Sequence, residues 1–291
     1  MDRMTATSRA GHLDRMLAGL GVTPRTVDVA GVRTRLLDIG DGPPLILLHG
    51  GIECGGALWA PVVGRLAGRH RVLVPDLPGL GESAPVGRLD VGRFESWFID
   101  LLRITGVAPP TVVAHSLTGG LAVRAAAGWS SGIVRRLVVY ASPAIGAYRM
   151  PPRLRYLAIR FAIRPTERNA ERFDRFALLD LDATRRRDPE WFHAFEAYNL
   201  SRARVPHVKR TMAQLIRTQT KPVPDPELDR IDVPVLLIWG RHDRMVPLGI
   251  AEAASARHDW PLYVVDGAAH VPHIEQPEPF VDLLHKIEMA E

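Results

Sequence analysis

The sequence predicts an α/β protein: a mostly parallel central sheet flanked by helices, with an inserted helical cap. Three observations support this prediction. Short β-rich runs alternate with helix-like segments along most of the chain, the order expected of a mostly parallel sheet. Several runs are apolar without interruption, as strands buried on both faces require. Between residues 144 and 220 the strand signal disappears and only helical patterns remain.

The first half of the chain is expected to form most of the sheet. A turn at Gly31 separates the first two strands, and the run PLILLH at 44–49 indicates a buried strand. The alternation that follows implies right-handed crossovers between parallel strands. Strands are expected at 26–30, 32–39, 44–49, 71–75, 111–115 and 134–140, and helices at 57–67, 91–105 and 117–127.

After the helical segment the alternation returns, with strands at 234–239 and 262–265 and helices near 248–256 and from Pro277. We interpret residues 1–143 and 221–291 as the α/β core and 144–220 as a helical cap lying over the sheet. Ordinary crossover helices are the alternative, and the absence of intervening strands argues against them.

Composition excludes several classes of protein. Of the 291 residues 46% are hydrophobic and 24% are charged, which argues against a disordered chain. No apolar run approaches the ~18 residues of a membrane span. The single cysteine, Cys54, cannot form an internal disulfide, which fits a reducing compartment. The N-terminus has no sustained apolar region, so we expect no secretory signal and a cytoplasmic protein.

The net charge of +5 raises the question of nucleic-acid binding. The arginines are scattered, mostly beside acidic residues, and no basic run is interleaved with aromatic residues. We therefore expect no nucleic-acid partner.

The positive charge is concentrated in residues 144–220, with 16 arginines and lysines against 8 acidic residues. A solvated outer face is one interpretation. Arginines that face a pocket and favour an anionic substrate are a second, and a partner or membrane surface is a third. The segment also holds nine of the chain's 19 aromatic residues, which favours a mainly apolar or aromatic small-molecule substrate.

The strongest local signal is VVAHSLTGG at 112–120, where a buried strand runs directly into a helix with Ser116 at the corner. Such a turn lifts the serine hydroxyl clear of the sheet. It also places backbone N–H groups at a helix N-terminus, where negative charge is stabilised. A helix-capping serine is the alternative, because serine is a preferred N-cap residue.

An aspartate and a histidine much later in the chain complete a pattern with Ser116. Asp243 follows the strand PVLLIW, and His270 follows the strand LYVV. Both are expected at strand carboxyl ends, where open α/β sheets build their sites. A serine hydroxyl needs an adjacent base, and a carboxylate orients the imidazole of that base. No metal-ligand spacing is present, so neither a metal nor a cofactor is expected.

These motifs resemble the α/β-hydrolase fold superfamily, in its capped serine esterase and lipase-like branch, over about residues 27–284. LLHGG at 47–51 resembles the family's oxyanion loop, and DLPGLGES at 76–83 resembles the turn after its fourth strand. AHSLTGG resembles the nucleophile elbow, and the Asp243 and His270 segments resemble the acid and base loops.

The resemblance implies a role for each matching residue. Ser116 would be the nucleophile, His270 the general base and then acid, and Asp243 the orienting acid. The backbone N–H groups of Gly51 and Leu117 would form the oxyanion hole, with Ile52 as the alternative to Gly51. Substrate contacts are expected from Ile52, His115 and Val271.

The implied reaction is hydrolysis of a carboxylic ester or related acyl bond through an acyl-enzyme. Acyl transfer, lactone or amide hydrolysis, cofactor-free perhydrolysis, lyase chemistry and a ligand receptor with slow hydrolysis are the alternatives. Val271 stands where carbon–carbon bond hydrolases of this fold often carry tryptophan, which argues against that activity. Ser116 itself argues against the branches that use an aspartate nucleophile.

Some residues near the motifs are expected to be structural. Ala114 and Thr118 replace the two glycines of the usual G-x-S-x-G elbow. Alanine is small, whereas threonine is stiff, and we expect its side chain to lie on the helix side of the elbow. His49 is expected to hold loop geometry, Asp76 to hold a turn, and Cys54 to be non-catalytic.

Overall fold

The computed structural model describes residues 11–129 and 132–289. Residues 1–10, on which the expectation of no secretory signal partly depends, lie outside this description. Among the described helices, none is both long and apolar enough to cross a bilayer.

The core of the molecule is a sheet of eight strands in the order β1-β2-β4-β3-β5-β6-β7-β8. Strand β2 (Val32–Ile39) pairs antiparallel with both β1 (Arg25–Val29) and β4 (Arg71–Pro75), and every other pair is parallel. This confirms the predicted α/β class with a mostly parallel sheet. The remaining strands are β3 (Pro44–Leu48), β5 (Thr111–His115), β6 (Arg136–Tyr140), β7 (Val235–Gly240) and β8 (Leu262–Val265).

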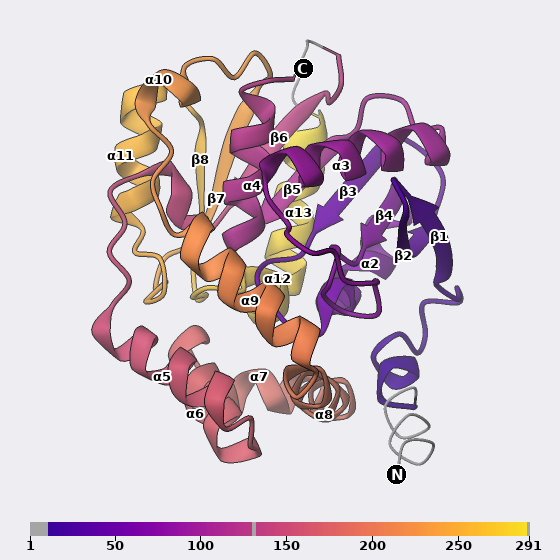
Figure 1. Cartoon of the computed structure of the whole chain (residues 1–291), viewed down its shortest axis with the longest axis vertical. Helices are drawn as coiled ribbons and strands as arrows, with labels where there is room; N and C mark the ends of the chain where they lie inside the picture. The colour runs from indigo at the N-terminus through magenta and orange to yellow at the C-terminus, as the bar shows by residue number, and fades with distance from the viewer. Residues whose placement is uncertain (1–10, 130–131, 290–291) are drawn as a thin grey trace.

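Helices cover both faces of the sheet (Figure 1). On one face α3 (Val91–Thr105) packs against α4 (Ser116–Ala126), and on the other α2 (Ala60–Leu66) packs against α13 (Pro277–Met289). The other helical elements outside the α5–α9 segment are η1 (Gly55–Trp59), η2 (Pro143–Ile145), α10 (Asp225–Leu228), α11 (Gly249–His258) and α12 (Pro272–Glu275).

Several predicted helix boundaries differ from those observed by one to three residues, among them the following two. The segment predicted as one helix at 57–67 forms the 3₁₀ turn η1 and then α2, which has Pro61 in its first turn. Proline is favoured there because the first N–H groups of a helix have no intrahelical partner. The helix predicted from Leu117 begins one residue earlier, at Ser116.

Between β6 and β7 the chain forms helices and no strand long enough to join the sheet. Figure 1 shows α5 to α8 gathered beyond one end of the sheet, with α9 running between them and the core. The division into a core at 1–143 and 221–291 and a cap at 144–220 stays a prediction. The helices of this segment are α5 (Pro152–Ile163), α6 (Glu167–Ala177), α7 (Leu181–Arg187), α8 (Pro189–Ala203) and α9 (Pro206–Gln219).

Candidate active site

Ser116 lies at the junction of β5 and α4 with a backbone φ of +52°. A non-glycine residue in this region costs about 1–3 kcal/mol and persists only where the surrounding structure enforces it. One such constraint is Gly119, at which an added Cβ would lie 2.6 Å from Cβ of Ser142. Helix α4 therefore packs directly against the chain that leaves β6, and the corner between strand and helix stays sharp.

The structure brings the three predicted residues together. Nε2 of His270 lies 3.0 Å from Oγ of Ser116, and its Nδ1 lies 2.8 Å from Oδ2 of Asp243. The backbone N–H groups of Met245 and Val246 donate to the other carboxylate oxygen, Oδ1, at 2.8 and 2.9 Å. Because a carboxylate only accepts, Nδ1 of His270 carries the proton and the lone pair of Nε2 faces the serine hydroxyl.

His115 connects the Ser116 corner to the loop that carries His270. Its Nε2–H donates to the main-chain carbonyl of His270 at 3.1 Å. Burial holds the pKa of His115 well below its usual value and lowers that of nearby His273 to about 3. Both imidazoles are therefore neutral near pH 7 and add no positive charge beside His270.

His49 holds the loop that follows β3. Its Nε2 accepts from the N–H of Leu77 at 3.0 Å, so its proton lies on Nδ1, which donates to the carbonyl of Gly50 at 2.8 Å. The expectation that His49 holds loop geometry agrees with these bonds. The bonds also tie the loop to the turn after β4.

The Gly50 carbonyl accepts a second bond, from the N–H of Ile52 at 2.8 Å. A trans peptide unit points its C=O and its N–H in opposite directions, so fixing the Gly50 carbonyl also fixes the N–H of Gly51. Within residues 11–129 and 132–289, neither the N–H of Gly51 nor that of Leu117 donates to a protein acceptor. The geometry thus favours Gly51 over Ile52 as the free donor beside Ser116.

Thr118 contributes a contact that the sequence does not reveal. Its hydroxyl donates to the main-chain carbonyl of His49 at 2.5 Å, and the residue is fully buried. The side chain thus links α4 to the end of β3, two residues before Gly51. Nothing in the sequence around Thr118 indicates a partner 69 positions away.

Glu275 is a second residue that sequence reasoning missed. Its Oε2 accepts from the N–H of Ala269 at 2.8 Å, and its Oε1 accepts from the N–H of Leu179 at 2.6 Å. The N–H of His270 donates to the carbonyl of Ala177 at 3.1 Å. The corner between α6 and α7 is therefore bonded to the loop that carries His270. An acid within the run HVPHIEQP was the only sequence signal.

The same corner also contacts the loop that carries Asp243. The guanidinium of Arg244 donates to the carbonyls of Arg175 and Leu178. Arg187 of α7 donates to the carbonyl of Ile274 at 2.9 Å. Hence the chain at 175–179 is bonded to both loops that position the partners of Ser116.

Ser116 and His270 open into a cavity of about 620 Å³. Gly51, Leu117, Ile52, His115 and Val271 line it, as do five of the nine aromatic residues of 144–220. The wall contributed by the α5–α9 segment is mostly apolar. Its apolar lining residues include Leu154, Ala158, Ile159, Phe161, Ala162, Phe173, Leu178, Phe192, Phe195, Met212, Ala213 and Ile216.

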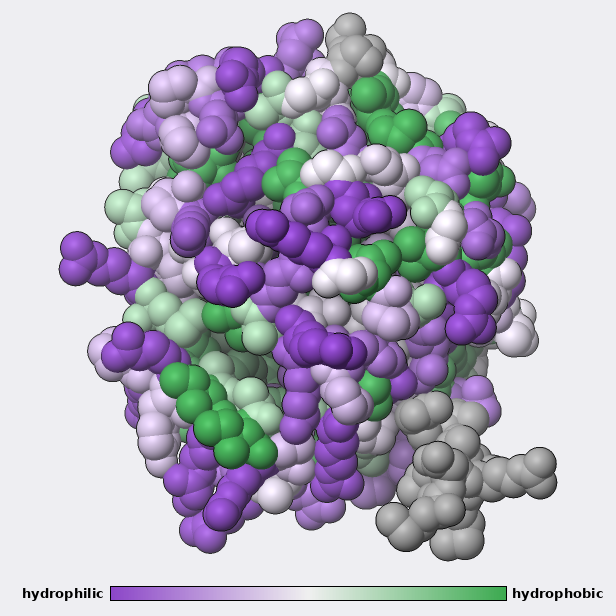
Figure 2. Space-filling model, viewed as in Figure 1, coloured by the Kyte–Doolittle hydropathy of each residue, from purple (hydrophilic) through white to green (hydrophobic). Residues whose placement is uncertain are grey.

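The mouth of the cavity lies between α5 and α9. Among the lining residues, only Arg155, Ile159, Ala162, Ala213 and Arg217 are exposed, and all five belong to these two helices. Figure 2 shows apolar surface gathered over α5 beside a recess, with hydrophilic residues close by.

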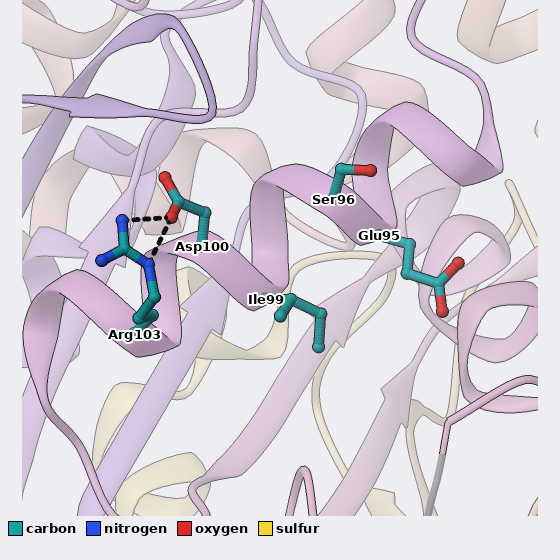
Figure 3. Close-up of a pocket in the computed structure, with 5 residues that line it drawn as sticks. All are labelled: Glu95, Ser96, Ile99, Asp100 and Arg103. Carbon is teal, nitrogen blue, oxygen red and sulfur yellow. Dashed lines mark hydrogen bonds and ion pairs between the residues drawn. The ribbon is translucent and has the colours of Figure 1, made fainter.

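A separate hollow lies on the outer surface of α3 (Figure 3). Arg103 and Asp100 form an ion pair of 2.7 Å at one end of it. Its lining residues all come from one helix, and they bring no base to Ser96. The hollow therefore has none of the chemistry of the Ser116 cavity. Its lining residues are Glu95, Ser96, Ile99, Asp100 and Arg103.

The remaining candidates hold structure. The carboxylate of Asp76 accepts from the N–H groups of Gly56 and Glu82 at 2.6 and 2.8 Å, which supports the interpretation that it holds a turn. Cys54 is fully buried, and burial raises the pKa of its thiol. A buried thiol with a raised pKa is a poor nucleophile.

The chain matches the model of the alpha/beta hydrolase family over residues 45–283. It therefore belongs to that family, as its motifs led us to expect.

Similar proteins include hydrolases of several names. The pimeloyl-[acyl-carrier protein] methyl ester esterase of Vibrio atlanticus is 28% identical, covering 83% of this chain and 92% of that protein. The structure of carboxylesterase CesB from Bacillus subtilis has a TM-score of 0.80 at 23% identity, covering 99% of both chains. That of 2-hydroxy-6-oxo-6-phenylhexa-2,4-dienoate hydrolase from a Rhodococcus strain has a TM-score of 0.77 at 22% identity, covering 92% of this chain and all of the other. At these identities the structural similarity concerns the fold.

Proposed function

We propose that this protein is a serine hydrolase that cleaves a carboxylic ester or a related acyl bond through an acyl-enzyme. The observation that carries the proposal is the chain of hydrogen bonds from Ser116 Oγ through His270 to Asp243, which lies at a mostly apolar cavity. The names of the relatives, a methyl ester esterase and a carboxylesterase, support a small-molecule ester as substrate.

In the first half-reaction Ser116 Oγ attacks the carbonyl carbon while its proton passes to Nε2 of His270. The Asp243 carboxylate, which accepts from Nδ1, stabilises the imidazolium that forms. The carbonyl oxygen becomes an oxyanion, and the N–H groups of Gly51 and Leu117 stabilise it. Loss of one such donor typically slows the reaction by ~10²–10³-fold. His270 then protonates the departing alcohol, and the acyl group stays on Ser116.

In the second half-reaction a water molecule gives its proton to Nε2 of His270 and attacks the acyl carbon. The tetrahedral intermediate collapses, Ser116 recovers its proton and the carboxylic acid leaves. No cofactor or metal takes part in either half. The apolar wall of the cavity suits the hydrocarbon part of the substrate, since burying apolar surface contributes about 25 cal/mol per Å².

A covalent probe tests the proposal. Treatment with a fluorophosphonate should add one phosphonate group, on Ser116, and peptide mass spectrometry would locate it. Ser116→Ala should abolish both the adduct and the turnover of a panel of acyl esters. An adduct elsewhere with Ser116 unmodified, or ester turnover that survives in Ser116→Ala, would contradict the proposal. Acyl transfer to an added alcohol, measured in the same panel, separates hydrolysis from transferase activity.

A further inference from the structure

Three basic residues line the Ser116 cavity, and two of them are exposed at its mouth. Arg155 lines the cavity from α5, and Lys209 and Arg217 line it from α9. The two arginines are exposed and Lys209 is half-buried. The cations therefore flank the mouth from both of the helices that form it.

None of these three side chains makes an ion pair or a side-chain hydrogen bond with any residue in the described part of the chain. Other arginines of the same segment differ among themselves: Arg175 is paired with Glu171 and Asp182, whereas the exposed Arg164 has no ion pair in the described part of the chain. The cations at the mouth are therefore free to contact a ligand without breaking a protein contact.

The only acidic residues that line the cavity are Glu53 and Asp174. Burial raises the pKa of Glu53 to about 7 and that of Asp174 to about 8. The Glu53 carboxylate also raises the pKa of Asp174, so the two are close enough to repel each other. At pH 7 Glu53 is therefore about half ionised and Asp174 is mostly neutral, so the three cations leave the cavity with a net positive charge.

We propose that the substrate of this hydrolase is an ester that also carries an anionic group, a carboxylate or a phosphate, and that Arg155, Lys209 and Arg217 hold this group at the mouth. The inference rests on the proposed function of Ser116. The apolar part of the substrate would lie against α5 and α9 inside the cavity, with its ester carbonyl at Ser116 and its charged end between the two helices. Guanidinium groups suit this task because they bind carboxylate and phosphate through two parallel hydrogen bonds.

The test compares esters that share one leaving group and differ only in the acyl chain. One series has acyl chains of increasing length that end in a carboxylate, a second series ends in a phosphate, and the control series ends in a methyl group. Three charge contacts of the strength usual at a protein surface predict an anionic-to-neutral kcat/KM ratio of about ten at low ionic strength for the best chain length. The ratio should fall toward one as salt shortens the screening length to a few Å.

Variants at the mouth identify the residues responsible. In the triple variant Arg155→Gln, Lys209→Gln, Arg217→Gln the ratio should fall about tenfold, because the charge contacts are lost. The matched control, Arg164→Gln, Arg168→Gln, Arg210→Gln, removes the same charge from exposed positions that do not line the cavity, and its ratio should not change. Thermal melting and the rate of fluorophosphonate labelling check that both variants are folded.

The outcomes separate this inference from the proposed function. If Ser116 is not labelled and no ester of any series is cleaved, the proposed function is wrong. If neutral esters are cleaved but neither anionic series is preferred, or if the control triple lowers the ratio as much as the mouth triple, the anion inference is overturned. A preference confined to one anionic series, lost in the mouth triple alone, supports it and identifies carboxylate or phosphate as the group.

Discussion

The most informative single substitution outside the Ser116, His270 and Asp243 set is Glu275→Gln. Glu275 is 3% exposed, and its carboxylate accepts from three backbone N–H groups: that of Leu179 at 2.6 Å, that of Ala269 at 2.8 Å and that of Val271 at 3.4 Å. Two of the donors flank His270 in the chain. The third belongs to the corner between α6 and α7.

The expected loss of stability in Glu275→Gln follows from which of the three hydrogen bonds an amide can still accept. Glutamine keeps one acceptor oxygen and replaces the other with an NH₂ donor. Of the two possible orientations of the amide, the one that keeps more hydrogen bonds points the oxygen toward Ala269 and Val271 and the NH₂ toward the N–H of Leu179. The bond to Leu179 is then lost, and a bond to a charged acceptor contributes about 1.5–3 kcal/mol. At about 2–4 °C per kcal/mol for a domain of this size class, we expect the melting temperature to fall by roughly 3–12 °C.

Catalysis should suffer separately from stability. Release of the loop shifts His270 relative to Ser116, and a displacement of about 1 Å in a reacting group can cost ~10²-fold. We therefore expect Glu275→Gln to lower kcat, and the rate constant of fluorophosphonate labelling of Ser116, by about tenfold to a hundredfold. KM should change little, because Glu275 does not line the cavity. Both rates are measured well below the melting temperature of the variant.

Glu252→Gln is the matched control, since Glu252 is exposed on α11; it should leave melting temperature and labelling rate as they are. Should Glu275→Gln lower the melting temperature but leave the labelling rate intact, Glu275 supports the fold and does not position His270. An unchanged melting temperature would refute the energetic argument itself.

Two further predictions concern the elbow residue Thr118 and the two acids that line the cavity. Thr118→Val keeps the side-chain volume but removes the donor to the His49 carbonyl; the free energy of unfolding should fall by about 1–3 kcal/mol and kcat should change by less than about tenfold, whereas a gain of a hundredfold would mean that threonine distorts the elbow. Because the pKa values of Glu53 and Asp174 lie at about 7 and 8, both ionise as pH rises from 6 to 9. For the carboxylate series, whose charge is constant from pH 6 to 9, the anionic-to-neutral kcat/KM ratio should therefore fall over that interval and stay flat in Glu53→Gln, Asp174→Asn. Titration of His270 affects both esters alike and cancels in the ratio, so a flat ratio in the unmodified protein would contradict the argument. The groups that face the two acids are Glu171, Arg185, Glu196 and Asn199.

Much of the fold could be predicted because its central strands are buried on both faces. Such strands contain few polar residues, so their lengths are visible in the sequence, and β4 and β5 have the predicted bounds. The four-residue helices α10 and α12 were not predicted. An element of that length is about one helical turn and cannot display an apolar periodicity.

The part of the site that could be predicted is the part that the order of the strands determines. Residues at the carboxyl ends of neighbouring parallel strands must converge, so the positions after β5, β7 and β8 identified Ser116, Asp243 and His270 as one group. The bonds from Glu275 to Leu179 and from Thr118 to His49 follow no such rule. They depend on how a helix outside the sheet meets a loop of the core, and a single sequence does not encode that contact as a pattern.

A count of charged residues in the α5–α9 segment does not show which of them face solvent and which face the cavity. Sixteen basic residues against eight acidic ones indicated both a solvated outer face and a cationic pocket. The structure supports each for different residues: Arg175 pairs with acids on the surface, whereas Arg155 and Arg217 stand unpaired at the mouth. The helices that carry these two arginines also supply apolar wall to the cavity. A substrate with an apolar body and an anionic end would therefore use both properties of α5 and α9, whereas a neutral apolar ester would use only one.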